Sequence, residues 1–575
     1  MLTALALALT LNPLSAPKIC AQTESLSLVH SIAPIVIHVD AANGASISGS
    51  HVFKVTVDAG DAIVTRVEEY INGQLITSQS STPYLFTVNT LNYSDGPMTV
   101  KFVAYTDSGN QAAKILKLKV NNGLGEGATD HVTKGNQDFE NGNYNQALEQ
   151  GLVALKADPK SVAAKLLVAR VYLLKKTYDK SQTMVEDVLG DDPKNLDALN
   201  LAGIIGVDEA FNIYNGTSSS SNALATISKA LNYAVTNRKA YLNAKFDAIQ
   251  NNATDSKSAI AYASRACAAN HFSSAIQVLK KQFLSDASNT ELANWLAYAE
   301  LREGRISDAL VNLGILKRTG SSSFDGYTEA IYAVLLTMSG HPNQADRSMS
   351  NAIMDDMSGL GVRTAQASIA LQENKTTDLA AMLNSLLNDA GQLTEVNYLV
   401  SSLEFKTQHY NSARKYMIKS LEADPANYLM YVEAGNQVVA GVLSSNADKA
   451  SQKEQYKVAK MFYQTALHAK GDSYEALTGL SIVSGFLGKP DDALSFAKAA
   501  VASQPTYAGA EYALSMAYGL FSGNKTAEKA ATAATDAGNL DAANLSGVTS
   551  PSPKTCFTYF STYGRTPVIA APPVS

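Results

Sequence analysis

The residues that could carry out catalysis are scattered along this chain without the spacings that catalysis needs. None of the eight histidines forms the H-E-x-x-H pattern, which would place two imidazoles on one helix face around a zinc ion. No G-x-S-x-G nucleophile turn occurs, and residues 523–526 (GNKT) match only the end of a phosphate-binding loop, without its earlier glycines or preceding strand. We therefore predict a non-enzymatic protein without cofactor, metal or small-molecule substrate. An enzyme with an unrecognised site is the weakest of three hypotheses.

Paired carboxylates and cysteines are the other candidates for chemistry. The acidic pairs fall mostly at predicted turns and helix ends, where they cap helices or are solvated: Glu68-Glu69, Asp191-Asp192, Asp355-Asp356 and Asp491-Asp492. The cysteines Cys20, Cys267 and Cys556 are too far apart in sequence for a zinc or redox motif. Cys267 is expected to be a small buried residue on a helix face, and a disulfide with Cys556 stays open.

Charge and the N-terminus bear on partners and location. The net charge is −6, which argues against a nucleic acid, because nucleic-acid-binding surfaces are usually basic. Residues 1–11 form an apolar run of the length found in signal peptides, although no basic residue precedes Lys18. We predict a signal peptide at residues 1–21 and an exported protein. No later segment is long and apolar enough to be a transmembrane span.

Residues 30–122 show the period-two alternation of β-strands. Phe53, Val55 and Val57 alternate with polar residues. Asn72-Gly73 stands between two apolar arms, which is a strong hairpin signal, and Asp95-Gly96 marks a second turn. Six or seven short strands in this length predict a β-sandwich.

The phrases of this region resemble bacterial immunoglobulin-like (Ig-like) modules of surface proteins. The matching phrases are YINGQ, SSTPYLFTVNT, YSDGPMTV and AYTDSGN. The resemblance implies a spacer or adhesion module outside the cytoplasm of a bacterium. A glycine-rich linker is expected at residues 123–129.

A repeat of 34 residues begins directly after this linker. Pro159 and Pro193 are 34 residues apart (193 − 159), as are Tyr144 and Tyr178 (178 − 144). Such a period, with small and aromatic residues at fixed offsets, predicts helix-turn-helix units. Residues 130–540 leave room for ten to twelve of them.

These units resemble the tetratricopeptide repeat (TPR) family. When each unit is numbered with its terminal proline at position 32, the small residues Gly135, Ala147, Ala413 and Ala493 fall at positions 8 or 20, where the two helices cross. The resemblance implies an α-helical solenoid, a right-handed superhelix with a concave groove that binds protein segments. In this family positions 2, 5, 6, 9, 12 and 13 face the ligand. Here the candidates at these positions are Asn136, Phe139, Arg170, Asn294, Trp295, Tyr298, Arg302, Tyr398, Asn436 and Tyr512.

The last segment, residues 541–575, contains a linker followed by an aromatic, strand-like tail. Alternating Phe557, Tyr559 and Tyr563 would form one face of a strand that adds to the open sheet edge of a second copy. The fold class expected for the chain is thus a multidomain β + α protein: an Ig-like sandwich, a TPR solenoid and a short β-like tail.

Two functions follow from these parts. The first is an exported, cell-surface or cell-envelope scaffold for protein–protein interaction. The alternative is a structural subunit of an extracellular filament or homopolymer, joined through the Ig-like domain and the tail. Glycosylation sequons, which would matter only in a host that modifies them, stand at Asn92, Asn215, Asn252, Asn374, Asn524 and Asn544.

Overall fold

A computed structural model of the full chain describes residues 34–216, 221–247, 253–319, 324–549 and 551–574. The chain divides into two compact units, residues 1–127 and 128–575, which are treated separately below. The predicted order, a β-sandwich followed by a helical repeat array, is confirmed. The predicted signal peptide at residues 1–21 lies outside the described residues.

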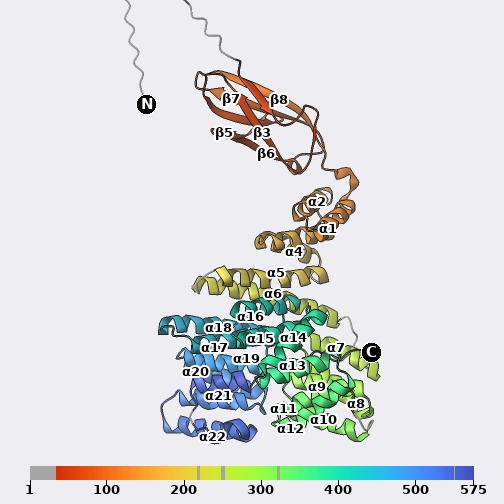
Figure 1. The fold of residues 1–575 in the computed structure, drawn as a ribbon, viewed down its shortest axis with the longest axis vertical. Helices are drawn as coiled ribbons and strands as arrows, with labels where there is room; N and C mark the ends of the chain where they lie inside the picture. The colour runs from red at the N-terminus through yellow and green to blue at the C-terminus, as the bar shows by residue number, and fades with distance from the viewer. Residues whose placement is uncertain (1–33, 217–220, 248–252, 320–323, 550, 575) are drawn as a thin grey trace, which may run out of the picture. The chain divides into compact units, whose positions relative to one another are not determined.

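The first unit is a sandwich of two sheets (Figure 1). One sheet has the order β1 (Val36–Val39), β3 (Ser50–Asp58), β6 (Tyr84–Asn89). The other has the order β2 (Ser46–Ile47), β8 (Gln111–Val120), β7 (Gly96–Thr106), β4 (Val64–Ile71), β5 (Gln74–Gln79).

The core of the sandwich forms from alternate residues of facing strands. The rings of Phe53 and Phe86 lie 5.7 Å and 5.2 Å from that of Phe102, and all three side chains are fully buried. The hairpin between β4 and β5 turns at Asn72 and Gly73, whose φ angles are 49° and 89°. Both values lie in the left-handed region that this turn requires, which is why Asn-Gly predicts it.

The second unit is built from helices joined by short turns. A 3-10 turn, η2 (Leu124–Glu126), precedes it. The helices are α1 (Ala128–Glu140), α2 (Tyr144–Ala157), α3 (Val162–Leu174), α4 (Tyr178–Asp191), α5 (Leu196–Gly216), α6 (Ser221–Asp247), α7 (Ser256–Ala268), α8 (Phe272–Ser285), α9 (Thr290–Arg302), α10 (Ile306–Thr319), α11 (Gly326–Met338), α12 (Pro342–Asp355), α13 (Leu360–Gln372), α14 (Thr376–Ala390), α15 (Thr394–Lys406), α16 (Tyr410–Ala423), α17 (Tyr428–Ser444), α18 (Lys449–Ala469), α19 (Tyr474–Phe486), α20 (Pro490–Ser503), α21 (Ala508–Gly519), α22 (Asn524–Leu540), α23 (Ala542–Leu545) and α24 (Pro553–Thr562). Helices α1 to α22 pair in order as antiparallel hairpins. Among the described helices, none is long and apolar enough to cross a membrane.

Small residues hold the two helices of a hairpin together. Ser401 in α15 donates a 2.8 Å hydrogen bond to the carbonyl of Ala413 in α16, and Ser481 in α19 donates one of 2.9 Å to Ala493 in α20. In each pair the serine stands at position 8 and the alanine at position 20. A bulkier residue at either place would separate the helices and break the bond.

The array closes on itself, so that hairpins distant in sequence touch. Helix α5 packs against α16, and α6 packs against α18. Arg238 in α6 forms a 3.1 Å ion pair with Asp424, and the Tyr428 hydroxyl donates to the Arg302 carbonyl at 3.2 Å. The concave side of the array is therefore a narrow interior rather than an open trough.

The prediction of a strand-like tail is wrong, because residues 553–562 form helix α24. Ser552 caps this helix in a reciprocal box with Thr555, and Pro553 occupies its first turn. Cys556, Phe557, Tyr559 and Phe560 are buried together, which is the i, i+3, i+4 pattern of one helix face. Helix α24 packs against α19 and α21.

Candidate functional site

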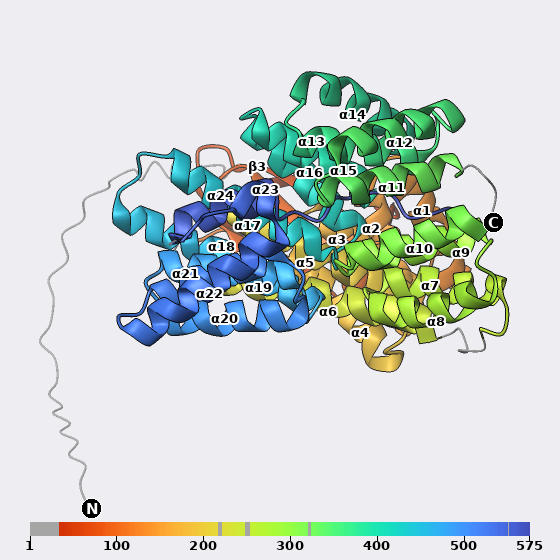
Figure 2. The same cartoon turned by 90° about the horizontal axis from the view of Figure 1, so that it is seen from below.

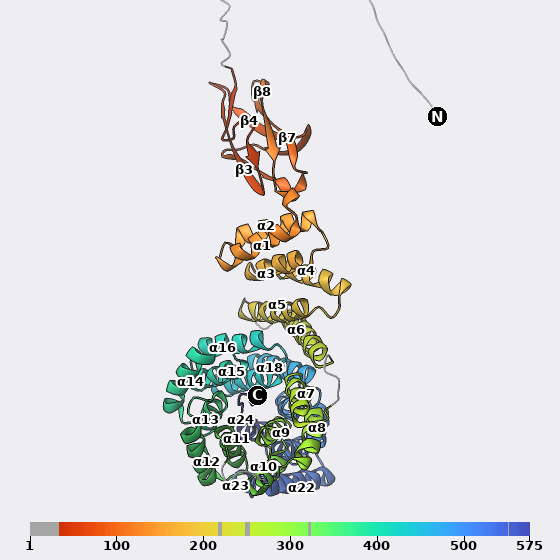
Figure 3. The same cartoon turned by 90° about the vertical axis from the view of Figure 1, so that its right-hand side faces the viewer.

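The interior of the array holds the last residues of the chain as an extended segment. Gly564 and residues 566–570 are buried, although no helix or strand includes them. Figure 2 shows this segment as a thin blue trace that crosses the array to the C-terminus. Figure 3 shows the helices from α7 to α18 arranged as a ring. We call residues 564–571 the docked tail.

Hydroxyl groups from two helices, α11 and α13, and from the turn before α21 bind the backbone of the docked tail. Ser368 Oγ accepts the Val568 N–H at 3.1 Å, and Thr364 Oγ1 accepts the Ala570 N–H at 2.9 Å. These two acceptors lie one turn apart on α13, which matches the spacing of alternate amides in an extended chain.

Two tyrosines bind the carbonyl groups of the same segment. The Tyr507 hydroxyl, from the turn before α21, donates to the Gly564 carbonyl at 2.8 Å. The Tyr327 hydroxyl, from α11, donates to the Ala570 carbonyl at 3.0 Å. Together with Ser368 and Thr364 they satisfy backbone groups at both ends of the segment, as a peptide-binding groove does.

Two carboxylates bind side chains of the docked tail. Glu433 of α17 lies 2.9 Å from the guanidinium of Arg565, and Glu475 of α19 accepts the Thr566 hydroxyl at 2.7 Å. The Tyr474 hydroxyl bonds Thr566 at 2.9 Å. Both carboxylates are 1% exposed, so protein groups replace water around them: besides the tail, Gln437 donates to Glu433 and Ser473 donates to Glu475.

Burial and charge shift the ionisation of groups around the docked tail. Burial lowers the pKa of the Arg565 guanidinium, but the charge of Glu433, the phenol groups of Tyr398 and Tyr463 and a hydrogen bond to Glu433 together raise the pKa above its ordinary value. Burial, followed by the positive charge of Arg565, lowers the pKa of Lys406 in α15 to about 8. The interior thus favours one cation beside Glu433 and disfavours a second.

The predicted groove residues divide into those beside the docked tail and those elsewhere. Tyr398 and Asn436 line a hollow with Gly564, Arg565 and Thr566. Trp295, Tyr298 and Arg302 line a cavity of about 310 Å³ that Val568 and Ala571 bound on another side.

The remaining predicted groove residues pack between helices. Asn294 accepts a 2.7 Å hydrogen bond from Thr328 of the next hairpin. The Tyr512 ring lies 5.6 Å from that of Tyr559 in α24. In the first two hairpins, residues 128–191, Arg170 donates to Asn136 at 3.0 Å and lies over the ring of Phe139, in a cluster separate from the docked tail.

Seven residues that contact the docked tail were not among the predicted groove residues, and the repeat numbering places five of them at ligand-facing positions. The other two, Tyr474 and Tyr507, lie outside those positions. With Ala345 at position 20, Tyr327, Thr364 and Ser368 fall at positions 2, 5 and 9 of their units. With Pro425 and Pro505 at position 32, Glu433 falls at position 6 and Glu475 at position 2. These are ligand-facing positions of the family. The predicted groove residues are aromatic, amide or arginine side chains, which leaves out the hydroxyl and carboxylate groups of Thr364, Ser368, Glu433 and Glu475, and Tyr327 was omitted although it is aromatic.

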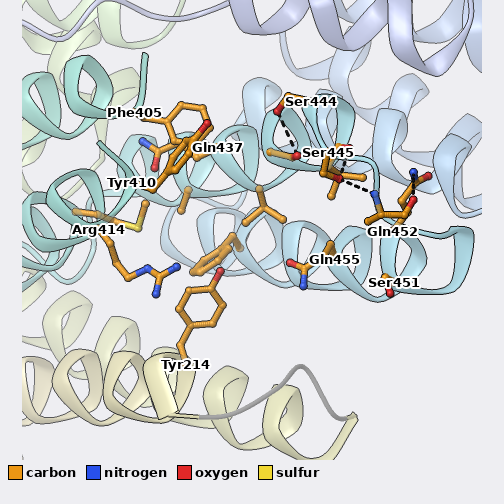
Figure 4. A pocket seen from close by; sticks show the side chains of 17 residues that line it. Tyr214, Phe405, Tyr410, Arg414, Gln437, Ser444, Ser445, Ser451, Gln452 and Gln455 are labelled. Carbon is orange, nitrogen blue, oxygen red and sulfur yellow. Dashed lines mark hydrogen bonds between the residues drawn. The ribbon is translucent and has the colours of Figure 1, made fainter. Parts of the chain in front are cut away.

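A second hollow lies between α5, α16, α17 and α18 (Figure 4). Its volume is about 560 Å³, and Tyr214, Tyr410, Arg414, Gln437 and Gln455 are among its lining residues. The Arg414 guanidinium lies 5.0 Å from the Tyr214 ring and donates to Asn215. No predicted groove residue lines this hollow.

The predicted self-assembly residues are not placed for strand addition. Phe557 and Tyr559 are buried on the inner face of α24, and only Tyr563 is exposed, at 55%. Cys267 and Cys556 are both buried and unbonded, so the disulfide left open by the sequence is absent. Among the described residues, no group of three or more His, Cys, Asp or Glu side chains could hold a metal ion.

The sequons that the structure describes lie at exposed positions: Asn92, Asn215, Asn374, Asn524 and Asn544. The sixth, Asn252, lies outside the described residues.

The comparisons with known proteins bear first on the sandwich. Residues 34–101 match the family model described as "Bacterial Ig domain". The sandwich is a bacterial Ig domain. The fibronectin(III)-like modules of Clostridium thermocellum CbhA are similar in structure at 18% identity, with a TM-score of 0.13, covering 15% of this chain and 96% of that one.

The helical array of this Ig-domain protein is similar to two TPR-containing structures. Yeast Tom70 matches at 13% identity with a TM-score of 0.34, covering 76% of this chain and 95% of that one. YrrB, described as a TPR protein with an unusual peptide-binding site, matches at 19% identity with a TM-score of 0.23, covering 34% of this chain and 94% of that one. No curated protein sequence matches. These values are low, so the assignment of TPR-type hairpins rests on the period and the helix crossings of this chain.

Proposed function

We propose that this protein is a non-enzymatic, exported scaffold whose helical array holds an extended protein segment in its interior. The observation that carries the proposal is the docked tail, whose backbone amides and carbonyls are bound by side chains from separate hairpins. A surface that binds alternate backbone groups of one extended segment is suited to binding others.

The Ig domain supports a location outside the cytoplasm. Domains of this kind occur as spacers or adhesion modules in bacterial surface proteins, and the apolar run at residues 1–11 fits the same route. In the proposed arrangement the Ig domain displays the array at the cell surface or in the envelope.

A filament subunit is the weaker alternative. Its motivation was a strand-forming tail, and the tail is instead helical and docked in its own array. The exposed edge strand β5, with Leu75 and Ile76 at 50% and 44% exposure, is the remaining feature that could pair with a second copy.

The test uses a chain that ends at Thr562 and a fluorescent peptide of residues 563–575. We expect saturable binding by fluorescence anisotropy, with loss of binding when Ser368→Phe fills the interior. Ser350→Phe, on the exposed face of α12, is the matched control and should bind as the parent does. A folded truncated chain that shows no saturable binding would contradict the proposed function.

A further inference from the structure

The contacts of the docked tail define which side chains the interior accepts. Glu433 and Glu475 are both almost fully buried. Glu433 forms an ion pair with Arg565 and accepts from Gln437, and Glu475 accepts from Thr566 and Ser473. If the tail left and nothing replaced it, Glu433 would lose its ion pair with Arg565. A buried carboxylate that loses its cation is strongly disfavoured, so the empty interior favours an incoming arginine.

The next positions are equally restricted. Thr566 is held between Glu475 and Tyr474, and this arrangement needs a hydroxyl that donates to the carboxylate and accepts from the phenol. Pro567 has no N–H and needs no acceptor, whereas the N–H groups of Val568 and Ala570 both donate to hydroxyl groups. Val568 and Ile569 are 5% and 1% exposed, so apolar side chains follow the proline.

The docked tail also fits its site incompletely. The cavity of about 310 Å³ beside Val568 and Ala571 is not filled by the chain. Trp295 and Arg302 are among its lining residues, and the Nε–H group of each is buried without a hydrogen-bond acceptor among the described residues. The Arg565 Nε–H is likewise buried without an acceptor. Unpaired buried donors weaken an interaction, so a segment that satisfies them can compete with the tail.

We propose that the array's ligand is an extended segment of a partner protein with the order arginine, hydroxyl residue, proline and two aliphatic residues. The docked tail of the same chain occupies the binding site in place of that segment, so it must leave the interior before the partner segment can bind. This inference rests on the proposed function and specifies its ligand. Helix α24 stays packed on α19 and α21 during the exchange, and only the residues after Tyr563 move.

The first test compares two chains and two peptides. Fluorescent peptides of residues 563–575, with the native sequence or with Arg565→Glu, are titrated into the full chain and into the chain ending at Thr562. The truncated chain should bind the native peptide at least about 30-fold more tightly than the variant peptide. The full chain should bind the native peptide about 100-fold more weakly than the truncated chain, because a tethered tail competes at an effective concentration near millimolar.

Each other outcome has a defined meaning. Equal binding of both peptides by the truncated chain would overturn the ligand class and leave the proposed function standing. Equal binding of the native peptide by the full and truncated chains would overturn the role of the tail as a competitor. Absence of binding to a folded truncated chain would remove the proposed function itself.

A second variant keeps the inference testable if the truncated chain does not fold. Arg565→Glu in the full chain places a like charge beside Glu433 and should expel the tail without shortening the chain. Trp295, the only tryptophan, borders the cavity next to the tail, so its fluorescence should shift to the red and the native peptide should bind more tightly than to the parent. Lys554→Glu, an exposed charge reversal on α24, is the control. Unchanged fluorescence and unchanged peptide binding in Arg565→Glu would overturn the proposal.

Discussion

The guanidinium of Arg565 lies 2.9 Å from the carboxylate of Glu433, inside the helical array and 132 residues away in sequence (565 − 433). This pair joins the last residues of the chain to the middle of a hairpin array. The interior of the helical array is therefore occupied by the docked tail.

Replacing Glu433 with Gln should destabilise the docked tail, because Arg565 keeps its charge in a buried site without a counterion. The expected loss is about 3 kcal/mol, the usual cost of breaking a buried pair. Hydrogen exchange of peptides that cover residues 564–571 measures it. The control is Glu454→Gln, which breaks an exposed pair with Lys457 and should cost less than about 0.5 kcal/mol. Equal effects of the two substitutions would show that the Arg565 pair does not hold the tail.

The serine at the crossing of α19 and α20 should be sensitive to size as well as to polarity. Ser481→Ala removes one buried hydrogen bond and should cost about 1 kcal/mol in the local opening of the hairpin. Ser481→Leu should cost about 3 kcal/mol, since it also forces the helices apart. Hydrogen exchange in α19 and α20 gives both values, with exposed Ser350→Ala as the control. A tolerated leucine would mean that the crossing is loosely packed.

The Ig domain should lose stability as the pH rises from 5 to 8. The Glu69 side chain is fully buried, and neither carboxylate oxygen has a hydrogen-bond partner. Burial raises the pKa of Glu69 to about 7, from 4.5. Between these two values the unfolded state releases a proton that the folded state keeps, so stability is present at low pH and falls as the pH passes through the folded pKa.

Amide hydrogen exchange in strands β4 and β7 of the full chain measures this loss of stability. The rates are corrected for the intrinsic effect of pH on exchange. Glu69→Gln should abolish the pH dependence and protect the strands better at pH 8. Parallel pH profiles for the parent and Glu69→Gln would assign the dependence to another group.

Both described cysteines should resist thiol reagents in the folded chain. Burial raises the pKa of Cys267 to about 12 and that of Cys556 well above its ordinary range, so neither forms a thiolate at pH 8. A disulfide-exchange reagent added at pH 8 should react with these two thiols only after urea is added. Cys267→Ser and Cys556→Ser chains assign the signal, and fast reaction in the folded state would contradict the burial.

Local patterns predicted the parts of the fold that depend on neighbouring residues. Asn72-Gly73 specifies its turn through backbone conformation, and the alanines at position 20 specify helix crossings through their size. The aromatic residues of α24 led to the wrong prediction of a strand, because the spacing of Phe557 and Tyr559 fits one face of a strand as well as one face of a helix. The N-cap at Ser552 favours the helix.

The site could be predicted only in part. The repeat numbering predicted that Tyr398 and Asn436 face the groove. The same numbering places the hydroxyl residues Thr364 and Ser368 at groove-facing positions, so they were predictable too. The docked tail could not be predicted, because the proximity of Arg565 to Glu433 arises only when the array closes and α24 turns the chain inward.

Hydrogen exchange at the amides of Val568 and Ala570 tests the central claim most directly. If Ser368 and Thr364 bind these amides, both should exchange at least about 100-fold more slowly than in the free peptide of residues 563–575, and Ser368→Ala should accelerate Val568 in particular. Exchange of both amides at the rate of the free peptide would show that the interior is empty and would contradict the account.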